Sequence, residues 1–397
     1  MIGGTTVLNP PERTCLLIAD ISGYTSYLAG VELDHAQDIL ADLIGTVVTA
    51  LRPTFRLAKL EGDAAFMAAP ADQLDGSLLL DTIERCYFGF RRRRRDVRQA
   101  TSCECDACMR IPDLNLKFIA HSGLVVRQDM AGLEELIGRD VIVVHRLLKN
   151  SVVEATGVDA YALISASCAT EMALEPAALG MAPHTETYEI VGEIPGWVHD
   201  LERRWQDEDA RARVFVTADE SVLGTTYEVS APPAVVWEYL TSPVRRLEWM
   251  AGVTDVIQDA AGNRRAVGAT NHCMHGKDAI LEQILDWRPF DYFTVLSTVQ
   301  TPAGPVDLAN TFEIEPTATG SRVSLRFRRP DDADKVHVLG PMLPMFQGMI
   351  DTGAAALRAI LDKEARVRAE AASEEPEIAG PRNDGDFANL PPITYAR

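Results

Sequence analysis

A highly charged run divides this chain into two segments whose apolar residues follow different patterns. The run extends from Arg203 to Glu220 and includes the string QDEDARAR at residues 206–213. Upstream, strand-like and helix-like stretches alternate, whereas downstream several strand-like stretches precede one long helix-like stretch. Since a domain has typically about 150 residues, a chain of 397 residues suggests two or three domains. We predict two, at 12–205 and 218–367, joined by a linker at 206–217.

The first segment has the pattern of a domain that mixes helices and strands. Cys15–Ala19 is a short apolar run that suits a buried strand. Between Ile39 and Leu51, apolar residues recur at the i, i+3, i+4, i+7 spacing of an amphipathic helix. Further strand-like runs lie at Phe55–Leu60, Asp63–Ala68, Leu114–Ala120 and Tyr161–Ile164.

The second segment predicts a curved antiparallel sheet that wraps around one closing helix and encloses an apolar cavity. It opens with a strand at Thr225–Val229 and a helix that begins near Pro232. The closing helix carries apolar residues on one face between Phe346 and Leu361. Residues 371–397 are rich in Glu, Gly and Pro and predict a disordered acidic tail.

Charge and cysteine content limit the classes of partner. The 38 Lys and Arg against 58 Asp and Glu give a formal net charge of −20, which excludes a broad surface for nucleic acid or anionic membranes. The five arginines Arg91–Arg95 are therefore expected to pair with carboxylates at a helix end, with a nucleic-acid patch as the alternative. No apolar stretch approaches the roughly 20 residues of a membrane helix. The seven cysteines, and a start unlike a signal peptide, predict reduced thiols in the cytoplasm.

Two aspartates stand at the ends of predicted strands in the first segment. Asp20 precedes a small, flexible turn, and Asp63 follows a tight turn. If the two strands are neighbours, the carboxylates converge, and with backbone N–H groups beside them they can hold Mg²⁺ or Mn²⁺ against a triphosphate. The alternative is that Asp20 caps the next helix and Asp63 only turns a hairpin.

Five motifs of this segment resemble, in order, the catalytic domain of class III nucleotidyl cyclases over about 190 residues. They are DISGYT at 20–25, KLEGD at 59–63, LKFIAHSG at 116–123, GRDVIVVHR at 138–146 and YEIVG at 188–192. Within that family the chain is most similar to an uncharacterised bacterial branch with the string HRLLKN, here at 145–150. The resemblance implies an α+β, ferredoxin-like fold and a nucleoside triphosphate as substrate.

The resemblance also implies a two-metal mechanism. The carboxylates of Asp20 and Asp63 and the backbone carbonyl of Ile21 would hold two Mg²⁺ or Mn²⁺ ions. One ion would lower the pKa of the ribose 3′-hydroxyl and the other would anchor the triphosphate. Arg146 would neutralise the charge that develops on the α-phosphate.

Further site residues follow from the same resemblance. Lys59 and Glu135 fall at the positions that contact the base, although this pair fits neither the usual ATP set nor the usual GTP set. Ser22 and Gly23 would contact the substrate through the turn after the first strand. Because members of the family build the site across a head-to-tail dimer, a homodimer is expected.

One position departs from the family pattern. The family has an Asn four residues before the transition-state Arg, where this chain has Ile142. Loss of one such hydrogen-bond donor costs about 2.7–4 kcal/mol of transition-state stabilisation, roughly a hundred- to a thousandfold in rate. The resemblance to the family therefore supports metal and nucleotide binding more strongly than catalytic turnover.

The spacing C-x-C-x-x-C at Cys103, Cys105 and Cys108 is typical of thiolates that converge on Zn²⁺. Structural zinc normally requires four ligands, so a fourth must come from Cys86, a histidine or another chain. A surface loop with reduced thiols is the alternative.

The second segment resembles the START-like, or polyketide-cyclase-like (SRPBCC), helix-grip superfamily over about 150 residues, starting with YEVSAPPAVVW at 227–237. The resemblance implies a cavity for a hydrophobic small molecule. Trp237, Trp249, His275 and Phe346 are candidates for its lining, with core packing as the alternative for the aromatic residues. Strand alternation places Cys273 and His275 on one face, either sharing a metal or facing the cavity, but an ordinary strand is simpler because no third ligand is evident.

Three functions remain open at this point. In the first, the chain is a sensor: a hydrophobic ligand of the second domain alters nucleotide cyclisation in the first domain. Nucleotide cyclisation is a phosphorus–oxygen lyase reaction. Alternatively, both domains bind ligands without catalysis and a partner receives the signal. In the third, the second domain is the enzyme and the first is its nucleotide-responsive regulator.

Overall fold

The computed structural model describes residues 9–31, 33–100, 106–130, 133–275, 278–301 and 304–374. Within these residues the chain forms two compact units, one that ends at Ala210 and one that begins at Arg211. The fold class is α+β, as predicted, with a mixed sheet in the first unit and an antiparallel sheet with a long C-terminal helix in the second. Over the described ranges, no helix is long and apolar enough to cross a bilayer.

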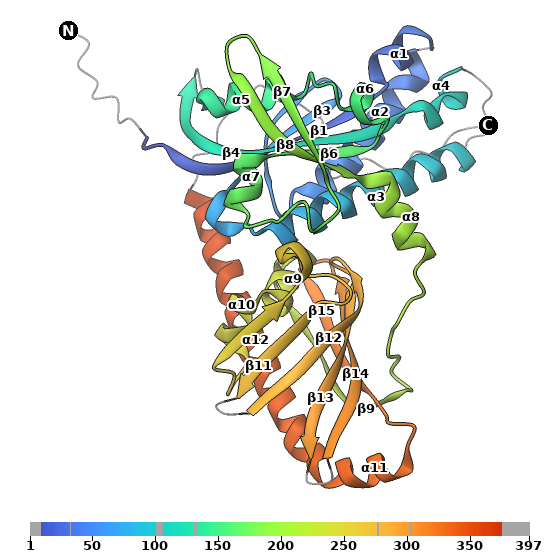
Figure 1. Ribbon diagram of the computed structural model, residues 1–397, viewed down its shortest axis with the longest axis vertical. Coiled ribbons are helices and arrows are strands. Elements are labelled where there is room, and N and C mark those ends of the chain that lie inside the picture. The colour runs from blue at the N-terminus through green and yellow to red at the C-terminus, as the bar shows by residue number, and fades with distance from the viewer. Residues whose placement is uncertain are drawn as a thin grey trace. The chain divides into compact units, whose positions relative to one another are not determined.

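The first unit combines one mixed sheet with helices that cover both of its faces (Figure 1). Its strands are β1 (Glu12–Ser22), β2 (Arg56–Glu61), β3 (Ala64–Pro70), β4 (Asn115–Met130), β5 (Leu133–Ile137), β6 (Tyr161–Ser165), β7 (Ala182–Tyr188) and β8 (Gly192–Asp200). Its helices are α1 (Tyr24–Ala29), α2 (Leu33–Leu51), α3 (Gly76–Ala100), α4 (Asp106–Met109), α5 (Arg139–Leu147), α6 (Val152–Thr156), α7 (Ala166–Glu171) and α8 (Leu201–Ala210). The sheet order is β2-β3-β1-β4-β6-β8-β7, with β5 paired to β4, and within this order only β4 and β6 run parallel.

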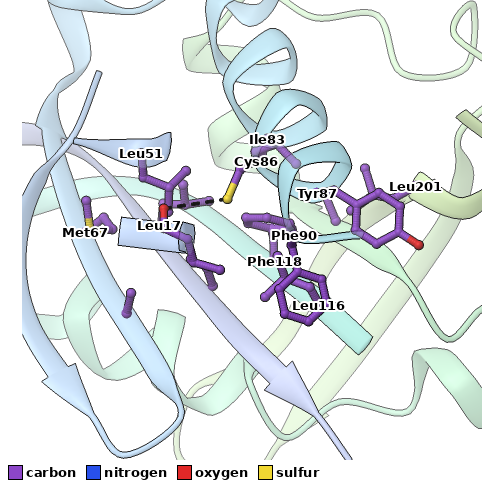
Figure 2. Close-up of a cluster of buried hydrophobic side chains, with 14 of the residues drawn as sticks. Leu17, Leu51, Met67, Ile83, Cys86, Tyr87, Phe90, Leu116, Phe118 and Leu201 are labelled. Carbon is purple, nitrogen blue, oxygen red and sulfur yellow. Dashed lines mark hydrogen bonds between the residues drawn. The ribbon is translucent and has the colours of Figure 1, made fainter. Parts of the chain in front are cut away.

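Strand β1 is apolar along most of its length because both faces of the sheet are covered. Leu17 belongs to the core on the α2 and α3 side, where it lies with Met67 and Ile83 (Figure 2). Leu16 and Ile18 belong to the core on the α5 side. Side chains alternate along a strand, so Asp20 emerges on the α5 side.

A β-bulge in the edge strand β2 changes which face its residues occupy. Leu57 pairs with Met67 and Lys59 pairs with Phe66, so Ala58 is the extra residue. Leu57 therefore packs into the α3-side core, whereas Lys59 lies on the α5 side with Phe66. Without the bulge, residues 57 and 59 would share a face.

Helix α8 begins just before the charged run that separates the two segments and extends into it. Its Trp205 packs edge to face against Phe88 of α3, with ring centroids 5.3 Å apart, and its Glu202 forms an ion pair with Arg91. Residues 206–210 of the predicted linker are therefore helical, because this helix has an apolar contact and a charged partner on α3.

The arginine run on α3 is used within the first unit. Besides Arg91, the Arg93 guanidinium donates to both carboxylate oxygens of Asp42 at 2.6 and 2.7 Å. Arg94 donates to the backbone carbonyl of Leu114. These bonds favour intramolecular pairing over a nucleic-acid patch.

The second unit is a seven-stranded antiparallel sheet with one long helix alongside it (Figure 1). Its strands are β9 (Ser221–Val229), β10 (Asp255–Asp259), β11 (Thr270–His275), β12 (Asp278–Arg288), β13 (Tyr292–Thr301), β14 (Gly304–Pro316) and β15 (Ser321–Arg328). Its helices are α9 (Pro233–Thr241), α10 (Pro243–Trp249), α11 (Ala333–Leu339) and α12 (Leu343–Glu374). The sheet order is β10-β11-β12-β13-β14-β15-β9.

Helix α12 packs by an apolar stripe, as its residue spacing predicts. Leu357 and Leu361 are fully buried, and Gly353 lies against the indole ring of Trp249. The helix extends to Glu374, so residues 371–374 of the predicted tail are helical. The remainder of the predicted tail lies outside the described residues.

Candidate functional site

The sheet of the first unit brings Asp20 and Asp63 to the same place. Asp20 lies near the end of β1, opposite Ala64 of β3 and Lys117 of β4. Asp63 immediately precedes β3, and its backbone carbonyl accepts a hydrogen bond from the N–H of Ile21 at 3.2 Å. The chain turns here at Gly62, whose φ of 69° is a left-handed conformation that favours glycine. The two strands are neighbours, which was the condition for convergence of the carboxylates.

The negative charges of Asp20 and Asp63 are only partly compensated by positive charge nearby. Burial, and after it the negative charge of Asp20, raise the pKa of Asp63 to about 6. The ammonium of Lys117 opposes this shift and lies 3.2 Å from a carboxylate oxygen of Asp20. Lys117 also donates to the backbone carbonyl of Leu148 at 3.4 Å.

This donor set fits a divalent cation only when other ligands complete the coordination. Among the described residues no group of three or more His, Cys, Asp or Glu side chains could hold a metal ion. Mg²⁺ is usually bound by one or two carboxylates together with waters and substrate phosphates. The carboxylates of Asp20 and Asp63 match that mode, with the carbonyl of Ile21 next to Asp20 in sequence.

The turn after β1 is held in one conformation by backbone contacts. Ser22 ends β1 opposite Asn115, and Gly23 adopts a φ of 88°. The carbonyl of Gly23 accepts hydrogen bonds from Tyr27 and Ser26, both at 2.9 Å. A Cβ at Gly23 would approach the carbonyl of Asp113 to 3.0 Å, so a larger residue would disturb this turn.

Lys59 and Glu135 contact each other. The ammonium of Lys59 lies 3.5 Å from a carboxylate oxygen of Glu135, and both side chains are partly exposed. The bulge at Ala58 is the reason that Lys59 lies on the face where this contact is made.

A histidine that the motifs left without a role lies beside this pair. The Nε2 of His145 lies 3.1 Å from a carboxylate oxygen of Glu61, and its Nδ1 lies 2.7 Å from the backbone carbonyl of Val141. The imidazole also packs edge to face on Phe66, with centroids 4.8 Å apart. The contact joins helix α5 to the edge hairpin β2–β3.

Helix α5 presents Arg146 and Ile142 to solvent. The side chain of Ile142 is 55% exposed. Within the described part of the chain, Arg146 makes no hydrogen bond or ion pair with Asp20 or Asp63. Arg146 does lie near Tyr188. Burial is the largest cause that raises the pKa of this phenol to about 12, and the positive charge of Arg146 opposes the rise. One protomer therefore does not join all the predicted site residues by direct contact.

A buried polar network fixes the start of α5. The Nε2 of His121 lies 3.1 Å from Asp140, and its Nδ1 lies 2.9 Å from the hydroxyl of Ser165. The second carboxylate oxygen of Asp140 accepts the N–H of Leu124 at 2.8 Å. Burial lowers the pKa of His121, and the hydrogen bond with Asp140 opposes that shift. A Cβ on Gly123 would lie 2.1 Å from the carboxyl carbon of Asp140.

The predicted zinc ligands are only partly described. Cys103 and Cys105 lie outside the described residues, so this site stays a prediction. Cys108 is buried in the core on the α2 and α3 side, to which Cys86 also belongs. The thiol of Cys86 donates to the carbonyl of Val47 at 3.7 Å, and burial raises its pKa well above the usual range.

The second unit contains a cavity of about 170 Å³ between its sheet and helix α12. Three of the four predicted lining residues, Trp249, His275 and Phe346, line it. Trp237 does not, because it is fully buried in an aromatic cluster and its ring lies 4.7 Å from that of Trp287. An ion pair between Arg246 and Glu282, which the motifs did not indicate, also lies in the wall.

Two family models match separate parts of the chain. Residues 40–156 match a family model described as a protein of unknown function (DUF2652), and residues 222–362 match one described as polyketide cyclase / dehydrase and lipid transport. The uncharacterized protein Rv2561/Rv2562 of Mycobacterium tuberculosis is 36% identical over 165 residues, which are 41% of this chain and 73% of that protein. The chain belongs to the family of this mycobacterial protein.

Solved structures resemble each domain of this family member separately. The adenylyl cyclase CyaB from P. aeruginosa is 13% identical and covers 48% of this chain and 96% of its own, with a TM-score of 0.37. Protein MLL2253 from Mesorhizobium loti is 21% identical and covers 36% of this chain and 96% of its own, with a TM-score of 0.28. In fold the first domain is similar to class III nucleotidyl cyclases, and the second matches the polyketide cyclase family model, in line with the motifs.

The charges around Asp63 predict opposite shifts in its pKa. Asp20→Asn removes the charge that raises this pKa, so we expect it to fall below about 6, whereas Lys117→Met removes the charge that lowers it and should raise it. NMR titration of the Asp63 carboxyl carbon measures both shifts, with Lys363→Met in the second unit as a control without effect. Since the pKa in the folded chain exceeds the ordinary 3.8, this carboxyl destabilises the fold increasingly as pH rises from about 4 to 6. Equal pKa values in the variants would contradict the assignment.

The contact between Gly123 and Asp140 predicts an effect on stability. Gly123→Ala forces Asp140 away from its hydrogen-bond partners, so we expect the unfolding free energy of the first unit to fall by about 2 kcal/mol. Gly45→Ala is the matched control in α2, where no atom lies within 4 Å of the added Cβ, and it should gain about 0.5–1 kcal/mol. Urea unfolding measures both changes. A loss of equal size in the two variants would count against the network.

Proposed function

We propose that the first domain binds a nucleoside triphosphate together with Mg²⁺ or Mn²⁺, and that the second domain binds a hydrophobic small molecule that regulates it. The observation that carries the first part is the proximity of the Asp20 and Asp63 carboxylates on neighbouring strands. A divalent ion would relieve their repulsion, and the phosphates would complete its coordination. The cavity in the second domain supports the second part.

The chain's own residues divide the work of binding. Asp20 and Asp63, with the Ile21 carbonyl, would hold the ion, which when bound supplies charge stabilisation at the phosphates and a more acidic ribose hydroxyl. Lys117 keeps the Asp20 carboxylate in place through its ion pair. Lys59 and Glu135 would contact the base, and the turn at 22–23 would lie against the substrate.

A homodimer would complete the site. Arg146 is exposed and makes no direct contact with the carboxylates of its own protomer, so it would act on a nucleotide held by a second copy. Leu60, Ile137 and Ile142 are exposed apolar residues of the same domain, 38%, 39% and 55% accessible, and pairing would cover them.

Turnover is weak or absent in this proposal because Ile142 offers no hydrogen bond. The second candidate function, a sensor that binds both ligands without catalysis, rests on the same residue. In either case the ligand of the second domain would act by biasing the arrangement of the first, a coupling between two sites.

Nucleotide binding is expected to depend on Asp63. The native chain should bind Mn²⁺ with ATP or GTP, and Asp63→Asn should weaken that binding roughly tenfold or more, because one of two carboxylate ligands is lost. Isothermal titration calorimetry measures this, with Asp307→Asn on the second domain as a control that keeps native affinity. Equal affinities in the native chain and Asp63→Asn would exclude the proposed metal–nucleotide site.

Restoring the missing hydrogen-bond donor should increase catalysis. Because Ile142 is exposed in a single protomer, an Asn at this position leaves the core of the domain intact, and in the dimer its amide would meet the nucleotide. We expect Ile142→Asn to raise formation of cyclic AMP or cyclic GMP with Mn²⁺ roughly a hundredfold. The control is Val153→Asn, another exposed apolar position in this domain, which should change nothing.

Chromatography measures the cyclic nucleotide formed, and either of two results would contradict this explanation of weak turnover. One is native product formation at the rate of active cyclases. The other is an Ile142→Asn variant that binds nucleotide normally and gains no activity.

A further inference from the structure

We propose that the cavity of the second domain selects a small, electrically neutral molecule of one or two rings that carries a hydroxyl, and that His275 forms a hydrogen bond with this hydroxyl. The inference rests on the proposed binding of a hydrophobic ligand and adds the ligand's size, charge and polar group. Three observations support it: the volume of the cavity, the pairing of its charges and an unpaired nitrogen in its wall.

The volume limits the ligand to a compact molecule. The cavity measures about 170 Å³, and an apolar cavity of roughly 150 Å³ accommodates benzene. Most of its wall is apolar, contributed by sheet and helix together: Leu223, Trp249, Val299, Phe312, Phe346 and Ile350. A molecule of one or two fused rings fills this space.

The charges in the wall cancel each other. The Arg246 guanidinium donates two hydrogen bonds to the Glu282 carboxylate, at 2.6 and 2.9 Å, and both residues are buried. Asn271 approaches the same carboxylate at 3.5 Å. A ligand carboxylate could bind Arg246 only by leaving Glu282 buried without its partner, which is strongly unfavourable. The wall therefore disfavours an anionic ligand.

A buried nitrogen in the wall lacks a partner. The Nε2 of His275 is buried and, within the described part of the chain, makes no hydrogen bond. The Asn310 amide in the same wall, by contrast, donates to Ser297 at 2.8 Å. A buried polar atom without a partner costs about 1–3 kcal/mol. A hydroxyl both donates and accepts, so it satisfies the imidazole nitrogen in either tautomer.

Three fluorescent probes of similar shape test the proposal on the full chain. 2-Naphthol is neutral with a hydroxyl, naphthalene is neutral without one, and 2-naphthoate is an anion. Equilibrium dialysis at pH 7 should rank their affinities in that order. A phenylalanine in place of His275 keeps a ring but removes the hydrogen bond, so His275→Phe should reduce the preference for 2-naphthol over naphthalene by about fivefold.

Two variants locate the effect. His272→Phe is the matched control, because His272 lies on the same strand but on the exposed face, and it should leave the preference unchanged. Ala354→Phe fills the cavity from helix α12 and should abolish binding of all three probes. Circular dichroism of each variant checks that it folds.

The outcomes separate this inference from the proposed function. Tighter binding of 2-naphthoate, or equal binding of 2-naphthol and naphthalene that Ala354→Phe still abolishes, overturns the selectivity while the hydrophobic site stands. An unchanged preference in folded His275→Phe overturns the role of His275. Absence of binding by any probe contradicts both the selectivity and the hydrophobic site.

Discussion

The repulsion between two carboxylates, near the end of β1 and just before β3, is the constraint on which the candidate site of the first domain depends. Strand pairing, not attraction, holds Asp63 beside Asp20, because the register of β1 with β3 leaves neither backbone free to move away. Partial burial weakens the screening by water, and Lys117 compensates only one of the two charges directly. Sites where the fold maintains an unfavourable charge arrangement are characteristic of ligand binding.

In the second domain, by contrast, the buried charges of the cavity wall are paired with each other. Arg246 and Glu282 satisfy each other within the wall of the cavity, so a ligand meets an environment without net charge. In that wall the buried Nε2 of His275 has no hydrogen-bond partner among the described residues. The first domain thus has negative charge that a cation could neutralise. The second has a buried hydrogen-bonding atom without a partner in a mostly apolar cavity.

Local patterns in the sequence predicted the elements well, and distant contacts poorly. The apolar run at Cys15–Ala19 lies in β1, and the i, i+3, i+4, i+7 pattern ending at Leu51 lies in α2. The partnership of Lys117 with Asp20 depends on the register of strands that are almost a hundred residues apart, which residue spacing does not encode. An aromatic residue such as Trp237 suits a core as well as a cavity, and only packing decides between them.

The extra residue in β2 has a consequence for how this family can diverge. Leu57 must be apolar to fill the core, and Lys59 must be polar to meet Glu135, yet ordinary alternation would place both on one side. Because the extra residue Ala58 places the two side chains on opposite faces, a substitution at one position need not affect the other. A lineage that lost this residue would have to exchange a core contact for a surface charge, or the reverse.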